Sequence, residues 1–244
     1  MQLRADPEIY SFASKAEADA TYLVIAWFAI TESAALGIFP IHAALGMGHS
    51  QGAAYITRFF EQSFRHFRDE QRHANLWCQA LLEFAGRYPE VIKRVKLPDW
   101  LLGVMLKSVG KPHNVRQFAV DCLAFETVMR AFYDVAHCRL NYPPLQPIFQ
   151  VIMRDEQKHT DFGQSYIFEL EGPLLRRERA GVAFRYWRNL AGVLITIQPL
   201  LKALDKHKTL PYQEFSAQVA GYVQETGIAG SHKLVPGLLK HLPL

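Results

Sequence analysis

The sequence has few cysteines and no strongly charged segment, and both absences restrict the class of protein. Only three cysteines occur among 244 residues, Cys78, Cys122 and Cys138, and no two of them form a CxxC pair. This excludes a disulfide framework and a cysteine-ligated zinc finger, and it favours a reducing, cytoplasmic setting. Lys and Arg number 27 against 23 Asp and Glu, without a basic run. Nucleic-acid binding is therefore not expected.

The sequence is more hydrophobic than a disordered chain, and its first residues do not form the basic start of a targeting peptide. Hydrophobic residues make up 50% of the chain, which is enough for a packed core. Four acidic residues precede the first apolar run: Asp6, Glu8, Glu17 and Asp19. Residues 21–48 contain only one formally charged residue, Glu32, and have the length of a membrane span. Because Glu32 and Pro40 both interrupt this run, we predict a buried helix and no membrane span.

Strand-like alternation is missing as well, and most of the glycines and prolines lie between long segments. This pattern predicts an all-α fold. Helices are expected at about residues 14–40, 51–86, 98–110, 114–141, 147–172, 173–208 and 211–227. Four of them are long enough for a four-helix bundle. We predict a single domain over residues 1–244, with the bundle at about 14–172 and accessory helices at about 173–244.

Two segments of the chain nearly repeat each other, RDEQRH at 68–73 and RDEQKH at 154–159. In each, a Glu precedes a His by three positions, so both side chains leave one face of a helix about one turn apart. Each of these helices follows a helix with one acidic residue in an apolar stretch. The candidate ligands are thus Glu32, Glu70, His73, Glu126, Glu156 and His159.

The pattern of four carboxylates and two imidazoles on four helices predicts a dimetal site. Burying an unpaired carboxylate costs several kcal/mol or more, so these groups must be neutral, paired or metal-bound. Carboxylates with imidazole and without cysteine suit iron or manganese better than structural zinc. We predict two iron ions, with manganese or a mixed manganese/iron pair as alternatives. A bundle that kept these residues after losing its metal is the remaining alternative.

At these residues the chain resembles the ferritin-like diiron-carboxylate superfamily, which includes acyl-carrier-protein desaturases, aldehyde-deformylating oxygenases and arylamine N-oxygenases. The resemblance covers about residues 22–166 and matches both ExxH pairs and both lone glutamates. It implies a ferritin-like four-helix bundle with additional C-terminal helices, and a non-haem diiron oxygenase or oxidase. Ferritins proper normally lack a second complete ExxH, so simple iron storage is disfavoured.

The resemblance also implies a role for the aspartate before each ligand Glu. In the family such an aspartate serves the histidine of the opposite helix, which fixes the tautomer of that histidine. We therefore predict Asp155 near His73 and Asp69 near His159. The alternative is that both are exposed acids paired with neighbouring basic residues.

Two further residues are candidates for the site. His66 precedes Glu70 by four positions and shares its helical face, so it is either an additional ligand or a core histidine. Arg130 lies one turn after Glu126, at an offset where hydroxylases and desaturases of the family often carry Thr. It either pairs with a carboxylate near the metals, receives an acidic substrate group, or lies at the bundle surface.

These residues predict an enzyme that uses dioxygen as co-substrate to oxidise an apolar or aromatic organic molecule. The four ligand glutamates and Arg130 are the expected catalytic groups, and a reductase or ferredoxin is the expected electron donor. Five aromatic residues are candidates for the substrate lining: Trp27, Phe28, Phe125, Phe132 and Phe149. The alternatives are a ferroxidase or peroxide-scavenging iron protein, and a helical scaffold without activity. The sequence leaves open whether the protein forms a homodimer and which type of oxidation it catalyses.

Overall fold

The computed structural model describes residues 10–47, 53–95, 114–168, 174–206 and 210–228. Within these ranges the chain is all-helical, as predicted, and no strand occurs. The helices are α1 (Lys15–Met47), α2 (Ala53–Arg87), α3 (Pro89–Arg94), α5 (Val115–Arg139), α6 (Gln146–Phe168), α7 (Arg176–Lys206) and α8 (Tyr212–Glu225), with a 3₁₀ turn η1 (Pro143–Leu145) before α6.

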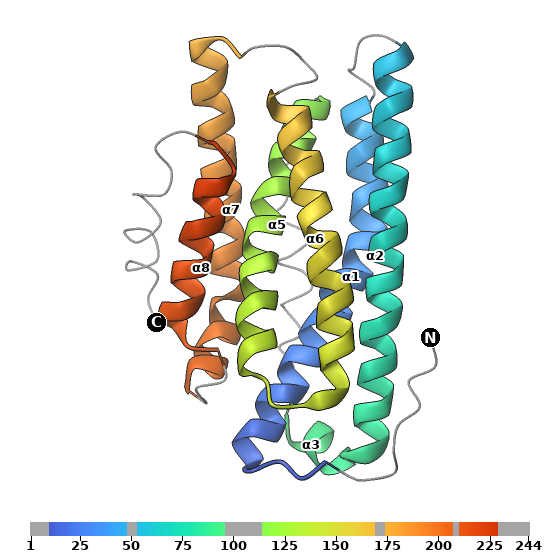
Figure 1. Cartoon of the computed structure of the whole chain (residues 1–244), viewed down its shortest axis with the longest axis vertical. Coiled ribbons are helices and arrows are strands. Elements are labelled where there is room, and N and C mark those ends of the chain that lie inside the picture. The colour runs from blue at the N-terminus through green and yellow to red at the C-terminus, as the bar shows by residue number, and fades with distance from the viewer. Residues whose placement is uncertain (1–9, 48–52, 96–113, 169–173, 207–209, 229–244) are drawn as a thin grey trace.

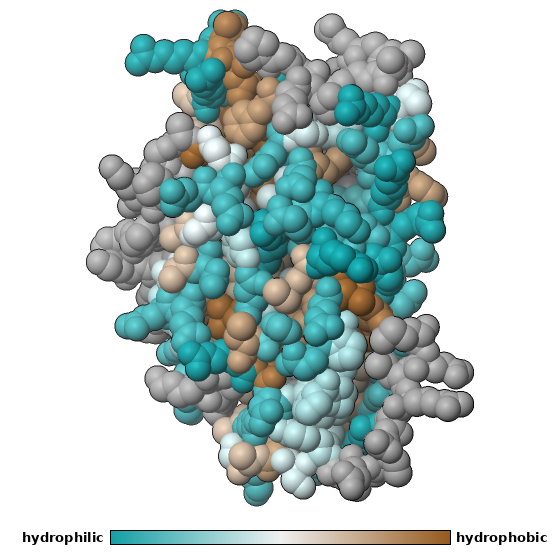
Figure 2. Space-filling model, in the orientation of Figure 1, coloured by the Kyte–Doolittle hydropathy of each residue, from teal (hydrophilic) through white to brown (hydrophobic). Residues whose placement is uncertain are grey.

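The long helices form two pairs that face each other (Figure 1). Helix α1 packs along α2, and α5 packs along α6. The pairs meet where α1 contacts α5 and where α2 contacts α6, while α7 and α8 cover the other side of α5. Figure 2 shows that hydrophilic side chains dominate the middle of the face over α6 and α2.

Helix α1 carries the apolar segment that has the composition of a membrane span. Among the described residues, one stretch, Lys15–Gly37, is long and apolar enough to cross a membrane, and 61% of its 18-residue apolar window is buried inside the structure. This burial agrees with the predicted buried helix. The expected end of this helix near Pro40 is wrong, because α1 continues through Pro40 to Met47. A proline removes one backbone hydrogen bond, and the neighbouring turns of this 33-residue helix keep theirs.

The other helix boundaries follow local signals closely. Asn114 caps α5, since its side chain accepts a hydrogen bond from the backbone N–H of Gln117 at 2.8 Å. Gly227, with φ of 68°, follows α8 in the left-handed conformation that glycine adopts without strain. The short helix α3 was not predicted; it starts at Pro89, where proline suits the first helical position. The helix expected at 98–110 lies outside the described residues.

An ion pair joins the accessory helix α7 to α5. The guanidinium of Arg185 donates through Nε to Asp121 Oδ1 at 2.6 Å, and Asn189 donates to the same carboxylate. Asp121 is buried, so its charge requires these partners. This contact fixes α7 against α5.

Candidate metal centre

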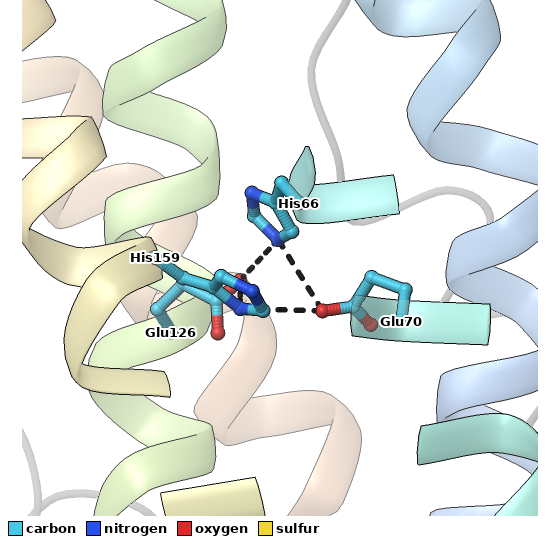
Figure 3. A group of neighbouring side chains, drawn as sticks. All are labelled: His66, Glu70, Glu126 and His159. Carbon is cyan, nitrogen blue, oxygen red and sulfur yellow. Dashed lines mark ion pairs between the residues drawn. The ribbon is translucent and has the colours of Figure 1, made fainter. Parts of the chain in front are cut away.

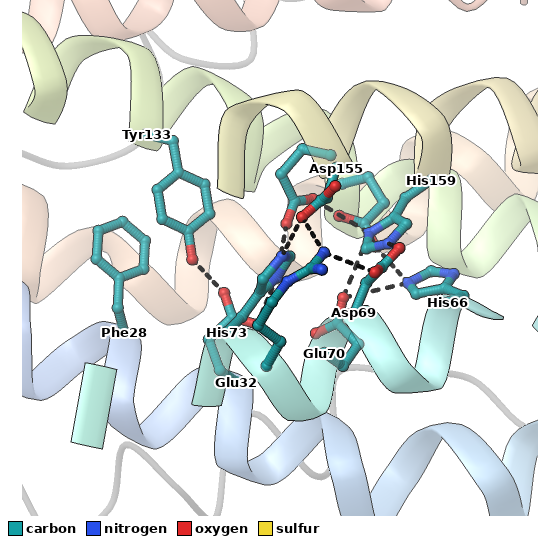
Figure 4. A network of polar contacts seen from close by, with 12 residues as sticks. Phe28, Glu32, His66, Asp69, Glu70, His73, Tyr133, Asp155 and His159 are labelled. Carbon is teal, nitrogen blue, oxygen red and sulfur yellow. Dashed lines mark hydrogen bonds and ion pairs between the residues drawn. The ribbon is translucent and has the colours of Figure 1, made fainter. Parts of the chain in front are cut away.

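The six predicted ligands all lie in the interior, although every one of them is polar or charged. Their relative exposures run from 0 to 6%. Helix α1 supplies Glu32, α5 supplies Glu126, and the two ExxH pairs come from α2 and α6. The three-residue spacing places each pair on the inner face of its helix, while the intervening Gln71 and Gln157 are exposed. The sequence pattern therefore brings four carboxylates and two imidazoles into one buried region, and Figure 4 labels Glu32, Glu70, His73 and His159 among them.

One group in this region contains four side chains from three helices: His66, Glu70, Glu126 and His159 (Figure 3). One ligand atom from each lies within 4.8 Å of the others. His66 Nε2 lies 3.3 Å from Glu70 Oε1 and 3.4 Å from Glu126 Oε1, and His159 Nδ1 lies 3.3 Å from the same Glu70 oxygen. The rings of His66 and His159 stack with centroids 3.6 Å apart. The structure thus places His66 among the candidate ligands of this group.

A second group lies beside the first and contains Glu32, His73 and Glu156. His73 Nδ1 lies 3.8 Å from Glu32 Oε2 and 3.5 Å from Glu156 Oε1. The other oxygen of Glu156, Oε2, lies 3.6 Å from Nδ1 of His159 in the first group. Glu156 therefore faces both groups, one carboxylate oxygen toward each histidine.

The donor atoms fit metal ions, because several of them are buried without a hydrogen-bond partner. Among the described residues, His73 Nδ1, His159 Nδ1 and Glu156 Oε2 are buried and form no hydrogen bond. Buried polar atoms are normally paired, and each unpaired one leaves a desolvation cost of about 1–3 kcal/mol. Imidazole nitrogen and carboxylate oxygen are donors that suit iron, manganese and zinc. The described chain thus contains two adjacent buried groups that could each hold a metal ion.

Each histidine of the two motifs turns its second ring nitrogen toward an aspartate of the opposite helix. His73 Nε2 lies 3.2 Å from Asp155 Oδ2, and His159 Nε2 lies 3.7 Å from Asp69 Oδ2. The first distance is that of a hydrogen bond, and the second is longer. A proton on Nε2 leaves the Nδ1 lone pair facing the ligand groups. The crossed arrangement is the one that the family resemblance implied.

Both aspartates also pair with basic residues, which is the alternative that the sequence left open. Asp155 is fully buried and also binds Lys158 Nζ at 2.8 Å and the guanidinium of Arg72. Arg72 donates to Asp69 as well, at 2.7 Å. Burial opposes ionisation, but His73, Lys158 and Arg72 together lower the pKa of Asp155 well below its usual range. Asp155 is therefore a charged group that positions His73.

A tyrosine to which the sequence assigned no role contacts a candidate ligand. The hydroxyl of Tyr133 on α5 donates a hydrogen bond to Glu32 Oε1 (Figure 4). Burial and the nearby Glu32 raise the pKa of Tyr133 above its ordinary value, so the hydroxyl keeps its proton. Its ring stacks on Phe28, with centroids 4.1 Å apart, and Phe28 stacks on Trp77 at 4.7 Å. The spacing of seven residues after Glu126 put Tyr133 on the correct face, but only the structure shows the hydrogen bond.

Burial and neighbouring charges shift the pKa values of several side chains in the centre. Burial disfavours the charged imidazolium, yet hydrogen bonds to Glu126 and Glu70 raise the pKa of His66 to about 9. Burial and the charge of Glu32 raise the pKa of Glu70 to about 7. Burial also raises the pKa of Glu156 well above its usual value, with the nearby charge of Glu126 adding to the effect. These protons occupy donor atoms that a metal ion would require.

The side chain of Arg130 contacts residues of α6 and α8. Its guanidinium donates to Gln157 Oε1 at 2.7 Å, pairs with Glu225 of α8 at 3.5 Å, and lies over the Tyr222 ring at 3.9 Å from the centroid. Pairing with a carboxylate near the metals, one of the three roles considered for Arg130, is not among these contacts. The side chain instead contacts both α6 and α8, and on α8 it meets the acid Glu225 and the ring of Tyr222.

The opening next to the centre is a polar groove between α2 and α6 with a volume of about 960 Å³. His66, Asp69 and His159 border it, so it reaches the first group. The five aromatic residues predicted to line a substrate site do not border this groove. Four are fully buried in the core, Trp27, Phe28, Phe132 and Phe149, and Phe125 is half-buried against it.

Comparisons with protein families, characterised proteins and solved structures found no match to this chain. The described residues therefore form an all-helical structure with two adjacent, buried His/Glu groups that could hold metal ions.

Proposed function

We propose that the protein is a ferritin-like non-haem dimetal oxidoreductase that uses dioxygen to oxidise an organic molecule. The observation that carries the proposal is the position of Glu156, whose two oxygens face His73 and His159 at 3.5 and 3.6 Å. A carboxylate that faces two ligand groups suits two neighbouring ions rather than one. The order of ligands along α1, α2, α5 and α6 supports the ferritin-like assignment.

Seven side chains would hold the two ions. One ion would take Glu32, His73 and Glu156, and the other would take His66, Glu70, Glu126 and His159, with Glu156 shared. Iron is the preferred metal, and manganese or a mixed pair are the alternatives. When bound, such a pair supplies electrons for the reduction of dioxygen. Dioxygen takes up four electrons in the oxygenase and desaturase forms, two from the organic substrate and two from an external reductase or ferredoxin.

The chain prepares this site in three ways. Asp155 orients the His73 imidazole by a hydrogen bond and Asp69 faces Nε2 of His159, so that Nδ1 of each ring is directed inward. Tyr133 holds one oxygen of Glu32 and leaves the other toward His73. The stacked rings of Phe28 and Tyr133 border Glu32 and exclude water from that side of the centre.

The second candidate is a ferroxidase or peroxide-scavenging iron protein without an organic substrate. The polar character of the groove favours this candidate, because small polar species can reach the first group through it. The charge of the groove does not favour the ferroxidase, because four basic residues and only two acidic ones line it. An iron-entry path calls for an excess of acidic groups.

The test is anaerobic loading with ferrous iron followed by exposure to dioxygen and a chemical reductant. The proposal predicts two irons per chain and sustained dioxygen uptake that Glu70→Gln abolishes. Glu61→Gln, which makes the same change at an exposed position of α2, is the matched control and should retain the two irons and the dioxygen uptake. Accumulation of many ferric ions per chain would support the ferroxidase instead. Uptake no faster than that of free iron would contradict the proposal.

A further inference from the structure

A groove between α2 and α6 borders the candidate metal centre, and its lining includes residues of the first group only. His66 and His159 of the first group border the groove. Glu32, His73 and Glu156 of the second group do not. A molecule in the groove would therefore lie against the stacked imidazoles of the first group. A volume of about 960 Å³ suits a small organic molecule better than a protein segment.

The walls of the groove are polar and basic. Its lining contains four cationic side chains, Arg65, Arg68, Arg72 and Lys158, against two acidic ones. The remaining polar lining consists of amides and a hydroxyl: Gln62, Gln71, Asn75, Gln79 and Ser165. Only Leu76 and Phe162 are apolar. A neutral apolar molecule would desolvate these polar groups without replacing their hydrogen bonds, which costs free energy.

The two acids of the groove already have partners. Asp69 binds Arg72 and faces His159, and Asp161 accepts a hydrogen bond from Gln157 at 2.8 Å. Arg72 and Lys158 are in turn both bound to Asp155. The internal ion pairs of the groove therefore use two of its four cations.

The other two cationic residues of the groove are Arg65 and Arg68. Neither forms an ion pair or a side-chain hydrogen bond with any residue in the described part of the chain. They are three positions apart on α2, and Arg72 follows Arg65 by seven, so the guanidinium groups form a row along the groove. Two free guanidinium groups in one concave site match a carboxylate or a phosphate, which each of them can bind through paired N–H donors.

We propose that this groove binds the substrate of the centre through an anionic group, a carboxylate or a phosphate, held by Arg65 and Arg68. The rest of the molecule lies along the groove against His66 and His159. This inference rests on the proposed function only in naming the bound molecule a substrate. Binding of the anion to the two arginines needs no metal.

The test compares probes of equal shape and different charge. Benzoate and phenyl phosphate are the anionic probes, and benzamide is the neutral match of benzoate. Calorimetric titration is done on the metal-free and on the iron-loaded full chain. Both anions, or the one the site prefers, should bind at least about tenfold more tightly than benzamide, and added salt should weaken this preference.

Variants assign the binding to the two arginines. Arg65→Gln and Arg68→Gln should each weaken anion binding by about tenfold or more, as expected for a charge-assisted contact. Arg177→Gln removes the same charge from the exposed start of α7 and should change nothing. Metal content and dioxygen uptake of the same samples report separately on the proposed function. Equal binding of benzoate and benzamide, no binding of either anion, or an equal effect of Arg177→Gln would overturn the inference.

Discussion

Replacing Asp155 by asparagine should selectively weaken the half of the centre that contains His73. The substitution keeps the shape of the side chain and removes its charge. Asp155 is fully buried and lies 3.2 Å from His73 Nε2, so it fixes the imidazole and raises its basicity toward a metal. Arg72 and Lys158 lose a partner, but their side chains are 45% and 60% exposed and can be hydrated. The helices should therefore remain folded.

The size of the effect follows from the geometry. Loss of a partner that orients a metal-bound histidine costs about 10–100-fold in metal affinity, which is about 1.4–2.8 kcal/mol. Asp155 should lie in this range because its hydrogen bond to His73 is buried away from water. Asp69 is 3.7 Å from His159 and 21% exposed, so water can replace much of its contribution. Asp69→Asn should consequently cost less than about tenfold.

Competition between the metal-free protein and a chromophoric chelator, under anaerobic conditions, measures the affinity of each variant for ferrous iron. Circular dichroism checks that each variant keeps its helices. Asp161→Asn makes the same chemical change on the exposed face of α6 and should bind iron like the parent protein. Unchanged affinity in Asp155→Asn, or a larger loss in Asp69→Asn than in Asp155→Asn, would refute the reasoning.

Three further perturbations test other parts of the structure. Glu156→Gln should reduce the metal content from two ions per chain to at most one, because Glu156 faces both groups, and metal analysis showing two retained ions would count against its shared position. Arg185→Gln should leave Asp121 buried without its counter-ion and destabilise the fold by about 3 kcal/mol, seen as a fall in melting temperature of roughly 6–12 °C; no fall would show that the ion pair is not stabilising. Iron binding near pH 7 should release protons and strengthen as pH rises toward 9, because a pKa of about 9 for His66 and about 10 for His73 keeps both imidazoles protonated without metal. Calorimetry in buffers of different ionisation enthalpy measures this release, and a pH-independent affinity would contradict the assignment.

The ligand residues could be found in the sequence because their signal is local. Two ExxH strings on helices fix which side chains share a face, whatever the rest of the fold does. Glu32 and Glu126 stand out because each is a lone acid in an apolar stretch. A helix that buries such a stretch must bury the carboxylate with it, and the structure buries both.

Contacts between helices could not be predicted in the same way. Sequence spacing puts His66 on the face of Glu70, but its stacking on His159 depends on how closely α2 approaches α6. The contacts of Arg130 depend on α8, which lies far along the chain and supplies Glu225. The polar groove also arises from two helices that meet only in the folded chain, and no local pattern indicates that Arg65 has no ion-pair partner among the described residues.

The most direct test of the account is a crystal structure of the iron-loaded chain with anomalous diffraction measured at the iron edge. The account predicts two iron peaks, one beside Glu32 and His73 and the other beside Glu126 and His159, with Glu156 contacting both. A single peak, or no peak at these residues after loading with excess ferrous iron, would contradict the assignment of a dimetal centre.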